Sequence, residues 1–141
     1  MSEYTPLTRI SDQPLDPDEV EEAVTGPQHG AVVVFTGKVR DHDAGQAVSA
    51  LEYSAHPEAG KFLARVCAEM TAESGLPVAA VHRIGSLTVG DPAIAVAVAA
   101  PHRREAFTIC AELVDRIKHE VPIWKRQLFA DGMSEWVNAC G

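Results

Sequence analysis

Residues 93–122 read AIAVAVAAPHRREAFTICAELVDRIKHEVP, and this stretch decides the class of fold. Its first part, residues 93–100, is a short apolar run that is typical of a buried strand. Beyond it, apolar residues recur at helical spacing: Ala106, Ile109, Cys110, Leu113, Val114 and Ile117. Pro122 disfavours helical backbone at the residue before it, so we expect a helix over about residues 102–120.

Apolar runs bounded by turn residues predict further elements on both sides of this stretch. Upstream, a helix should begin with Asp16 as its N-cap and Pro17 in its first turn, and end near Gly26. The other expected elements are a strand at 30–36 buried on both faces, a loop at 38–46, a strand at 48–54, a helix at 57–75, a strand at 78–84, and a closing hairpin formed by 123–129 and 135–137 around Asp131-Gly132.

The order of these elements indicates the fold class. Helices alternate irregularly with strands, and the last strands form a hairpin, which is typical of an α+β domain with a mixed or antiparallel sheet. We expect a single domain over residues 1–141. Within it, residues 1–29 form an acidic N-terminal segment with one short helix, and residues 30–137 form the core that carries the motifs.

Composition and charge exclude several classes of protein. The chain has no apolar run of about 18 residues and no basic-then-apolar leader, so we expect a cytoplasmic protein that does not enter a membrane. Cys67, Cys110 and Cys140 lack the spacing of a disulfide framework or zinc site, and we expect the first two to be buried and inert. The net charge of −8 disfavours nucleic-acid binding.

Basic residues are nevertheless concentrated in three segments, which favours a small anionic ligand over a polyanion. In the first, Lys38, Val39 and Arg40 follow Gly37 at the end of an expected strand, where Arg40 can grip a phosphate with two parallel hydrogen bonds. The alternative is a turn with two solvated bases. The spacing of the glycines excludes a Walker phosphate loop.

The second basic segment is His102-Arg103, at the start of the expected helix over residues 102–120. Free backbone N–H groups and the positive end of the helix dipole favour an anion there. Cations at this end are electrostatically misplaced unless an anion joins them, although they can also simply point into water.

The third segment combines Lys118 with Lys125 and Arg126. On a helical wheel Lys118 falls at the border of the apolar stripe, where its amine is partly desolvated. Desolvation and neighbouring positive charges both disfavour the protonated form of an amine, which suits proton transfer. The alternative is that the lysine stems merely cover apolar surface.

Other catalytic chemistry finds no support in the sequence. The remaining histidines share no metal-ligand spacing: His29, His42, His56, His82 and His119. We therefore expect no metal site. No nucleophile elbow is present, and no cysteine has a histidine that the sequence identifies as its partner.

Four segments together resemble the large, catalytic subunit of molybdopterin synthase. They are residues 35–40 (FTGKVR), 81–85 (VHRIG), 100–103 (APHR) and 121–126 (VPIWKR). Their order and spacing agree with that family, and the likeness covers roughly residues 30–137. The pairing of FTGKVR with PIWKR is specific, whereas the acidic N-terminal segment is less diagnostic.

The resemblance implies a fold, an assembly and a reaction. The fold is an α/β hammerhead-like domain with an additional small antiparallel sheet, and the chain forms a homodimer. A small ubiquitin-like sulfur-carrier subunit binds at each end, which gives a heterotetramer. The C-terminal Gly-Gly of the carrier, activated as a thiocarboxylate, supplies sulfur to cyclic pyranopterin monophosphate. Two transfers yield the dithiolene of molybdopterin, and no permanently bound cofactor is implied.

The resemblance also assigns roles by position. Lys118 is the principal catalytic lysine and Lys125 its companion, and both contact substrate. The other substrate-binding positions are Lys38, Val39, Arg40, His102, Arg103, Arg126 and Gln127. Many family members have Glu where this chain has Gln127, so one negative charge is missing beside the expected pocket.

Two other functions are compatible with these patterns. One is a non-catalytic dimeric platform that binds a ubiquitin-like partner, although such a platform has no need of Lys118, Lys125 and Arg40. The other is an enzyme that acts on a different phosphorylated small molecule, such as a nucleotide, without any thiocarboxylated partner.

Overall fold

The main sheet is built around β7 (Pro92–Ala100), a run of small and β-branched residues that is buried along nearly its whole length. It lies between β5 (Val78–Arg83) and β2 (Ala31–Lys38) and is antiparallel to both. β1 (Leu7–Ser11) adds a parallel strand on the far side of β5, so the order is β1-β5-β7-β2. This confirms the expected mixed sheet.

The computed structural model describes residues 4–43, 46–129 and 134–138. Within these ranges, no helix is both long enough and apolar enough to cross a membrane. Two features considered in the sequence, Cys140 and the turn at Asp131-Gly132, lie outside the described residues.

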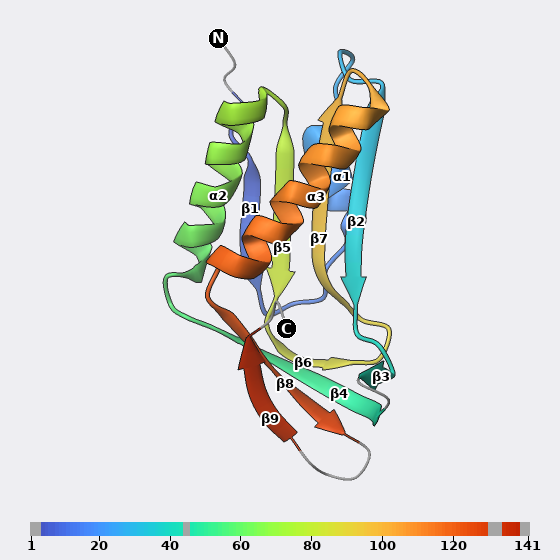
Figure 1. Ribbon diagram of the computed structural model, residues 1–141, viewed down its shortest axis with the longest axis vertical. Coiled ribbons are helices and arrows are strands. Elements are labelled where there is room, and N and C mark those ends of the chain that lie inside the picture. The colour runs from blue at the N-terminus through green and yellow to red at the C-terminus, as the bar shows by residue number, and fades with distance from the viewer. Residues whose placement is uncertain (1–3, 44–45, 130–133, 139–141) are drawn as a thin grey trace.

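Helices cover both faces of the main sheet (Figure 1). α2 (Ala59–Ser74) and α3 (Arg103–Glu120) pack on one face, and α1 (Pro17–Val24) packs on the other. Alternate residues of β7 point into the two cores, because side chains along a strand alternate between its faces. Val96 therefore joins the core under α2 and α3, whereas Ala97 joins the core under α1.

The helix ends follow the local sequence. The carboxylate of Asp16 accepts a hydrogen bond from the backbone N–H of Asp18 at 3.0 Å, which confirms the predicted N-cap of α1. The C-cap of α2 is Gly75, whose φ of 74° is readily adopted only by glycine. The C-cap of α3 is Val121, directly before Pro122.

A second sheet lies below the main one in Figure 1. It contains β3 (His42–Asp43), β4 (Gln46–Ala55), β8 (Ile123–Phe129) and β9 (Ser134–Asn138) in that order, with β6 (Gly85–Thr88) also paired to β4. All of its pairings are antiparallel. The expected combination of a mixed sheet with a separate antiparallel sheet is therefore confirmed, although the antiparallel sheet has five strands and the mixed sheet four.

Several details differ from the sequence-based predictions. β2 was expected to be buried on both faces, but it is an edge strand of the sheet and its residues are only half-buried. The expected loop at 38–46 contains the short strand β3. β1 and β6 were not predicted, because each is a short run without a clear alternation of apolar and polar residues.

The cysteines at the described positions behave as expected. Cys67 on α2 and Cys110 on α3 are buried and unpaired within the core. Burial raises the pKa of Cys67 to about 12 and that of Cys110 to about 11. Both therefore remain protonated thiols at neutral pH, which makes them poor nucleophiles.

Candidate active site

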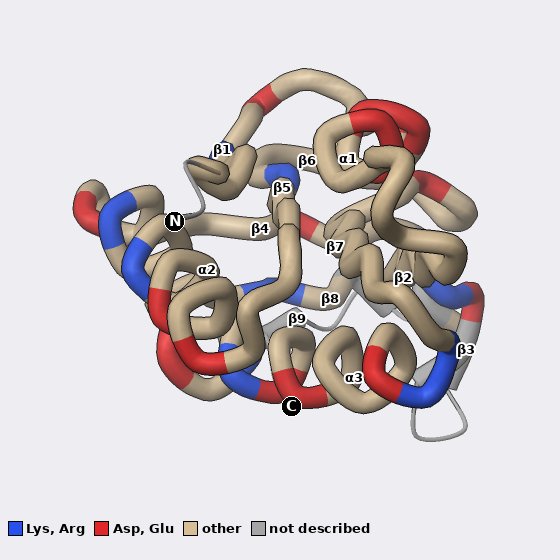
Figure 2. Tube along the Cα trace, turned by 90° about the horizontal axis from the view of Figure 1, so that it is seen from above, with Lys and Arg blue, Asp and Glu red and all other residues tan. Residues whose placement is uncertain are grey.

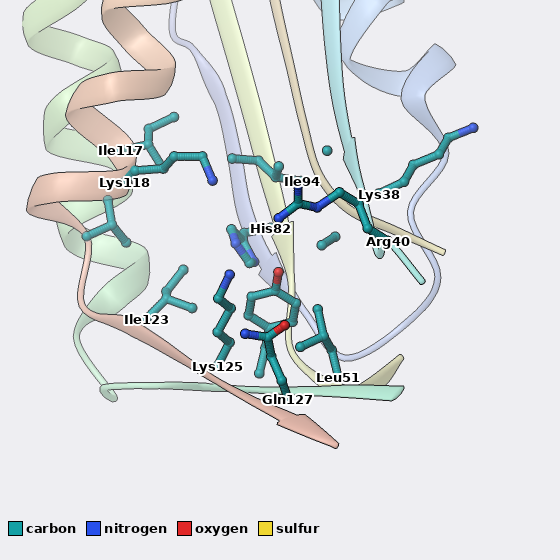
Figure 3. Close-up of a pocket in the computed structure, with 14 residues that line it drawn as sticks. Lys38, Arg40, Leu51, His82, Ile94, Ile117, Lys118, Ile123, Lys125 and Gln127 are labelled. Atoms are coloured by element: carbon teal, nitrogen blue, oxygen red, sulfur yellow. The ribbon is translucent and has the colours of Figure 1, made fainter. Parts of the chain in front are cut away.

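A cavity of about 240 Å³ lies where the main sheet, the C-terminal end of α3 and the second sheet meet (Figure 3). It brings together residues from five segments that are far apart in the sequence. Its lining consists of Gly37, Lys38, Arg40, Leu51, Tyr53, His82, Ala93, Ile94, Ile117, Lys118, Val121, Ile123, Lys125 and Gln127. Apolar walls around a few polar groups are typical of a small-molecule site.

Lys118 enters this cavity from the last turn of α3. It follows Ile117, which is buried in the core, and is itself half-buried, as its position at the border of the apolar stripe predicts. In Figure 3 its amine points towards His82 and the interior of the cavity. The helix thus fixes the base of the side chain, while the amine reaches into the space beside the sheet.

β8 divides its side chains between the cavity and the opposite face of the second sheet. Lys125 and Gln127 are two residues apart and both line the cavity. Arg126 lies between them and forms an ion pair with Glu52, its direct neighbour across β4 and β8. The structure therefore brings Lys125 and Gln127 together with Lys118 but does not place Arg126 in the cavity.

The end of β2 positions Arg40. The register of β2 against β7 shifts between Gly37 and Lys38, which marks a bulge of the kind that redirects a strand beside a site. A Cβ on Gly37 would lie 2.7 Å from Cγ2 of Ile94, so only glycine fits this close approach. Figure 3 shows the guanidinium of Arg40 pointing towards His82, whereas the amine of Lys38 points away from the cluster.

Val39 has a packing role in this chain. Its side chain is 4% exposed and lies in a small core with Leu51, Leu87 and Ala93. Its backbone N–H donates to the carbonyl of Asp91, and its carbonyl accepts from the N–H of Gly90. Val39 therefore anchors the segment that carries Arg40 and does not line the cavity.

His82 also lines the cavity, a role that its sequence pattern did not predict. It is the last inward-facing residue of β5, following Val78 and Ala80 on the same face of the strand. Its ring packs edge-on against Tyr53, with ring centroids 5.0 Å apart. Burial, with a contribution from the charge of Lys118, lowers the pKa of His82 to about 4. The ring is therefore neutral at physiological pH.

His102 and Arg103 lie at the other end of α3 from this cavity. Both are exposed, and His102 is the N-cap residue but makes no capping hydrogen bond with its side chain. Fifteen residues of helix separate Arg103 from Lys118, which corresponds to about 22 Å along the axis. One copy of the chain therefore cannot bring these two residues to the same small ligand.

The charge of the cavity differs from that of the whole chain. Its described lining includes Lys118, Lys125 and Arg40 but no aspartate or glutamate, and it contains no serine, threonine or cysteine. Acidic residues gather instead on other surfaces, notably at α1 (Figure 2). The cavity is thus suited to an anion, and a serine, threonine or cysteine nucleophile would have to come from outside the described lining.

Comparisons with known proteins agree with this architecture. Residues 10–120 match the family model described as MoaE protein. The chain is 42% identical over 134 residues to the molybdopterin synthase catalytic subunit 1 of Mycobacterium tuberculosis, which covers 94% of this chain and 90% of the relative. The chain belongs to the MoaE family.

Solved structures related to the MoaE family share this fold. The molybdopterin synthase of Staphylococcus aureus is 39% identical, with a TM-score of 0.84 over 91% of this chain and 94% of that one. A complex of subunits 1 and 2 of the molybdopterin-converting factor of Helicobacter pylori is 20% identical, with a TM-score of 0.72 over 94% and 89%. At that identity the second likeness concerns the fold alone. The family resemblance seen in the sequence is confirmed.

Proposed function

We propose that this chain is the catalytic subunit of a molybdopterin synthase, a sulfurtransferase that acts on a pterin in molybdenum cofactor biosynthesis. The observation that carries the proposal is the convergence of Lys118, Lys125 and Arg40 in one cavity of a MoaE-family chain. The described lining carries several cations and no carboxylate, and this positive charge suits an anionic substrate.

The substrate in this proposal is cyclic pyranopterin monophosphate. Sulfur comes from the C-terminal thiocarboxylate of a small ubiquitin-like carrier whose last residues are Gly-Gly. A carrier supplies its own nucleophilic sulfur, which suits a cavity whose lining has no serine, threonine or cysteine. The chain itself then needs only to position the reactants and to stabilise charge.

Each cavity residue has a role that follows from its placement. Lys118, held by α3 beside the apolar wall, stabilises negative charge on the reacting carbonyl or sulfur. Lys125 binds the pterin or moves protons, and Arg40 holds the phosphate. Gln127, beside Lys125 on the same face of β8, adds amide hydrogen bonds without charge.

The remaining predicted substrate residues act less directly in this proposal. Val39 fixes the segment that carries Arg40, and the stem of Lys38 borders the cavity while its amine points elsewhere. Arg126 holds β8 against β4 through Glu52. These placements predict smaller effects of substitution than at Lys118.

His102 and Arg103 reach a substrate only if a second copy of the chain brings them there. We propose a homodimer in which the start of α3 from one copy approaches the cavity of the other, where both residues would contact the phosphate. With one carrier at each end, the assembly is a heterotetramer. We propose that it works in the cytoplasm and that each chain acts as a single domain.

A reconstitution tests the proposed function. The purified chain is mixed with cyclic pyranopterin monophosphate and the carrier, prepared either as its thiocarboxylate or as the ordinary carboxylate. We expect the mixture that contains the thiocarboxylate form of the carrier to produce molybdopterin, measured as its fluorescent oxidation product. The mixture that contains the carboxylate form should produce none. Carrier binding without product would instead identify a binding platform, and tight binding of a nucleotide without any carrier dependence would identify an enzyme of another kind.

A further inference from the structure

The imidazole of His82 lines the cavity, and one of its two nitrogens contacts the backbone. Its Nδ1 lies 2.8 Å from the backbone carbonyl oxygen of Arg83. Because a carbonyl oxygen only accepts hydrogen bonds, Nδ1 must carry the proton that is donated. In the neutral ring Nε2 therefore has a free lone pair. Within the described part of the chain, no residue forms a hydrogen bond with Nε2.

The surroundings hold this ring in place and keep it neutral. His82 is 6% exposed, and Tyr53 packs against it edge-on. The ionisable groups that line the cavity with it are Lys38, Arg40, Lys118, Lys125 and Tyr53, none of which is a carboxyl. An imidazolium at this position would therefore be buried among cations without a compensating anion from the lining.

The reaction proposed above requires a base at one step. When the sulfur of a thiocarboxylate attacks a carbon of the pterin, a carbon–oxygen bond at that carbon breaks with its electron pair on oxygen. The sulfur is then bonded to both the carrier's carbonyl carbon and the pterin. The product of attack is a thioester, and the pterin is released only when the acyl carbon–sulfur bond is broken by water. Water attacks a thioester efficiently when a neighbouring base removes its proton.

We propose that Nε2 of His82 is the general base that activates the water which cleaves this thioester, an inference that rests on the proposed function. The water oxygen bonds to the carbonyl carbon of the carrier, and one water proton moves to Nε2. The acyl carbon–sulfur bond breaks with its electron pair on sulfur, so the pterin leaves as a thiolate and the carrier as a carboxylic acid. That acid releases the second proton of the water to solvent and becomes a carboxylate.

Neighbouring groups complete the step. The ammonium of Lys118 points to the same part of the cavity as His82 and stabilises the oxyanion that forms on the carbonyl carbon (Figure 3). The imidazolium is disfavoured by burial and by the charge of Lys118, so its proton passes on to the departing thiolate. His82 thereby returns to its neutral form before the second transfer.

Two variants separate this role from a structural one. His82→Asn keeps an N–H near Nδ1 for the carbonyl of Arg83, and His82→Gln places a non-basic amide near Nε2. His119→Asn is the matched control, because His119 makes the same 2.8 Å contact from Nδ1 to the carbonyl of Asp115 but is exposed. Thermal unfolding and carrier binding identify a variant that folds.

The experiment is a single turnover with thiocarboxylated carrier and cyclic pyranopterin monophosphate, quenched in acid and read by the intact mass of the carrier. We expect a folded His82 variant to accumulate carrier with the mass of the attached pterin, and to release product about a hundredfold more slowly than the wild type. His119→Asn should behave as the wild type.

Two kinds of result would overturn the proposal. If a folded His82 variant releases product at the wild-type rate, or is slow without accumulating the adduct, His82 is not the base for thioester cleavage. That outcome leaves the sulfurtransferase function intact. If the wild-type chain itself gives neither adduct nor product, the proposed function fails and the role of His82 fails with it.

Discussion

The two ends of α3 carry similar residues but have different surroundings. At its C-terminal end, Lys118 is half-buried in a cavity with Arg40 and Lys125. At its N-terminal end, His102 and Arg103 are exposed, and no cavity residue of the same copy lies within reach. Basic residues that look alike in the sequence therefore differ in a single copy of the chain: Lys118 lies in the cavity, whereas His102 and Arg103 lie outside it.

The difference has a physical explanation. Cations near a helix C-terminus are favoured by the helix dipole, and Lys118 has an apolar wall beside it. Cations at the N-terminus oppose the dipole and gain stability only when an anion is bound. His102 and Arg103 are therefore expected to act once a phosphate and a second copy are present, whereas the cavity around Lys118 is already assembled.

The largest effect is expected from Lys118→Ala. Loss of the ammonium removes charge stabilisation at the reacting centre, and turnover should fall by about 10²- to 10³-fold. Lys61, whose side chain is 80% exposed on α2, provides the matched control in Lys61→Ala. Carrier binding and thermal stability should stay near wild type in both. Near-normal turnover by Lys118→Ala would remove this residue from the reaction.

Mixing two inactive variants tests whether both ends of α3 serve one site. Lys118→Ala and the double variant His102→Ala/Arg103→Ala are each expected to be severely impaired. If a second copy completes the site, exchange of subunits yields mixed dimers with one intact site, and an equal mixture should recover about a quarter of wild-type activity. If activity stays at the level of the separate variants, the two ends belong to the same site of one copy or to different functions.

Arg40→Ala should have a smaller effect, mainly on substrate binding. A charge-assisted hydrogen bond contributes roughly 1.5–3 kcal/mol, which corresponds to about a 10- to 100-fold rise in KM. Arg9→Ala is the control, since Arg9 pairs at the surface with Glu19 of α1, on the other face of the main sheet from α3, and does not line the cavity. Steady-state kinetics measure KM for both variants, and only Arg40→Ala should show the rise. An unchanged KM in Arg40→Ala would contradict the phosphate assignment.

The last effect is on stability rather than on turnover, and it concerns the buried histidine of the cavity. His82 has a folded-state pKa of about 4, below its unfolded value of about 6.5. As pH falls, His82 therefore binds a proton in the unfolded chain before it does so in the folded chain. Between about pH 6.5 and pH 4 the wild type should lose about 3 kcal/mol of its free energy of unfolding through this residue.

Chemical denaturation at a series of pH values measures this loss. The glutamine of His82→Gln does not bind a proton, so the variant lacks the loss of stability that His82 causes in the wild type. The free energy of unfolding of the wild type should therefore fall towards that of the variant as pH falls from about 6.5 to 4. A constant difference between wild type and His82→Gln would show that His82 does not stay neutral in the folded chain.

Much of the fold could be predicted because local patterns determine it. Each helix boundary depends on residues that are adjacent in the sequence. The structure confirms the N-cap Asp16 of α1, the C-cap glycine of α2 and the end of α3 before Pro122. The edge position of β2 could not be predicted, since an apolar run does not say how many neighbours a strand has. The short strands β1 and β6 depend on partners distant in sequence.

The site could be predicted only in part for a similar reason. The sequence identified Lys118, Lys125 and Arg40, whose convergence depends on the meeting of α3, β8 and β2. It gave no role to His82, although that residue interrupts the inward apolar face of β5 after Val78 and Ala80. A polar residue at such a position is a signal, but its partners become visible only in three dimensions.

A crystal structure of the chain with bound cyclic pyranopterin monophosphate would test the central claim most directly. The account predicts the pterin inside the 240 Å³ cavity, beside Lys118 and Lys125, with its phosphate held by Arg40 and by His102 and Arg103 of a second copy. A ligand bound elsewhere, with the amine of Lys118 remote from it in every copy, would contradict the account.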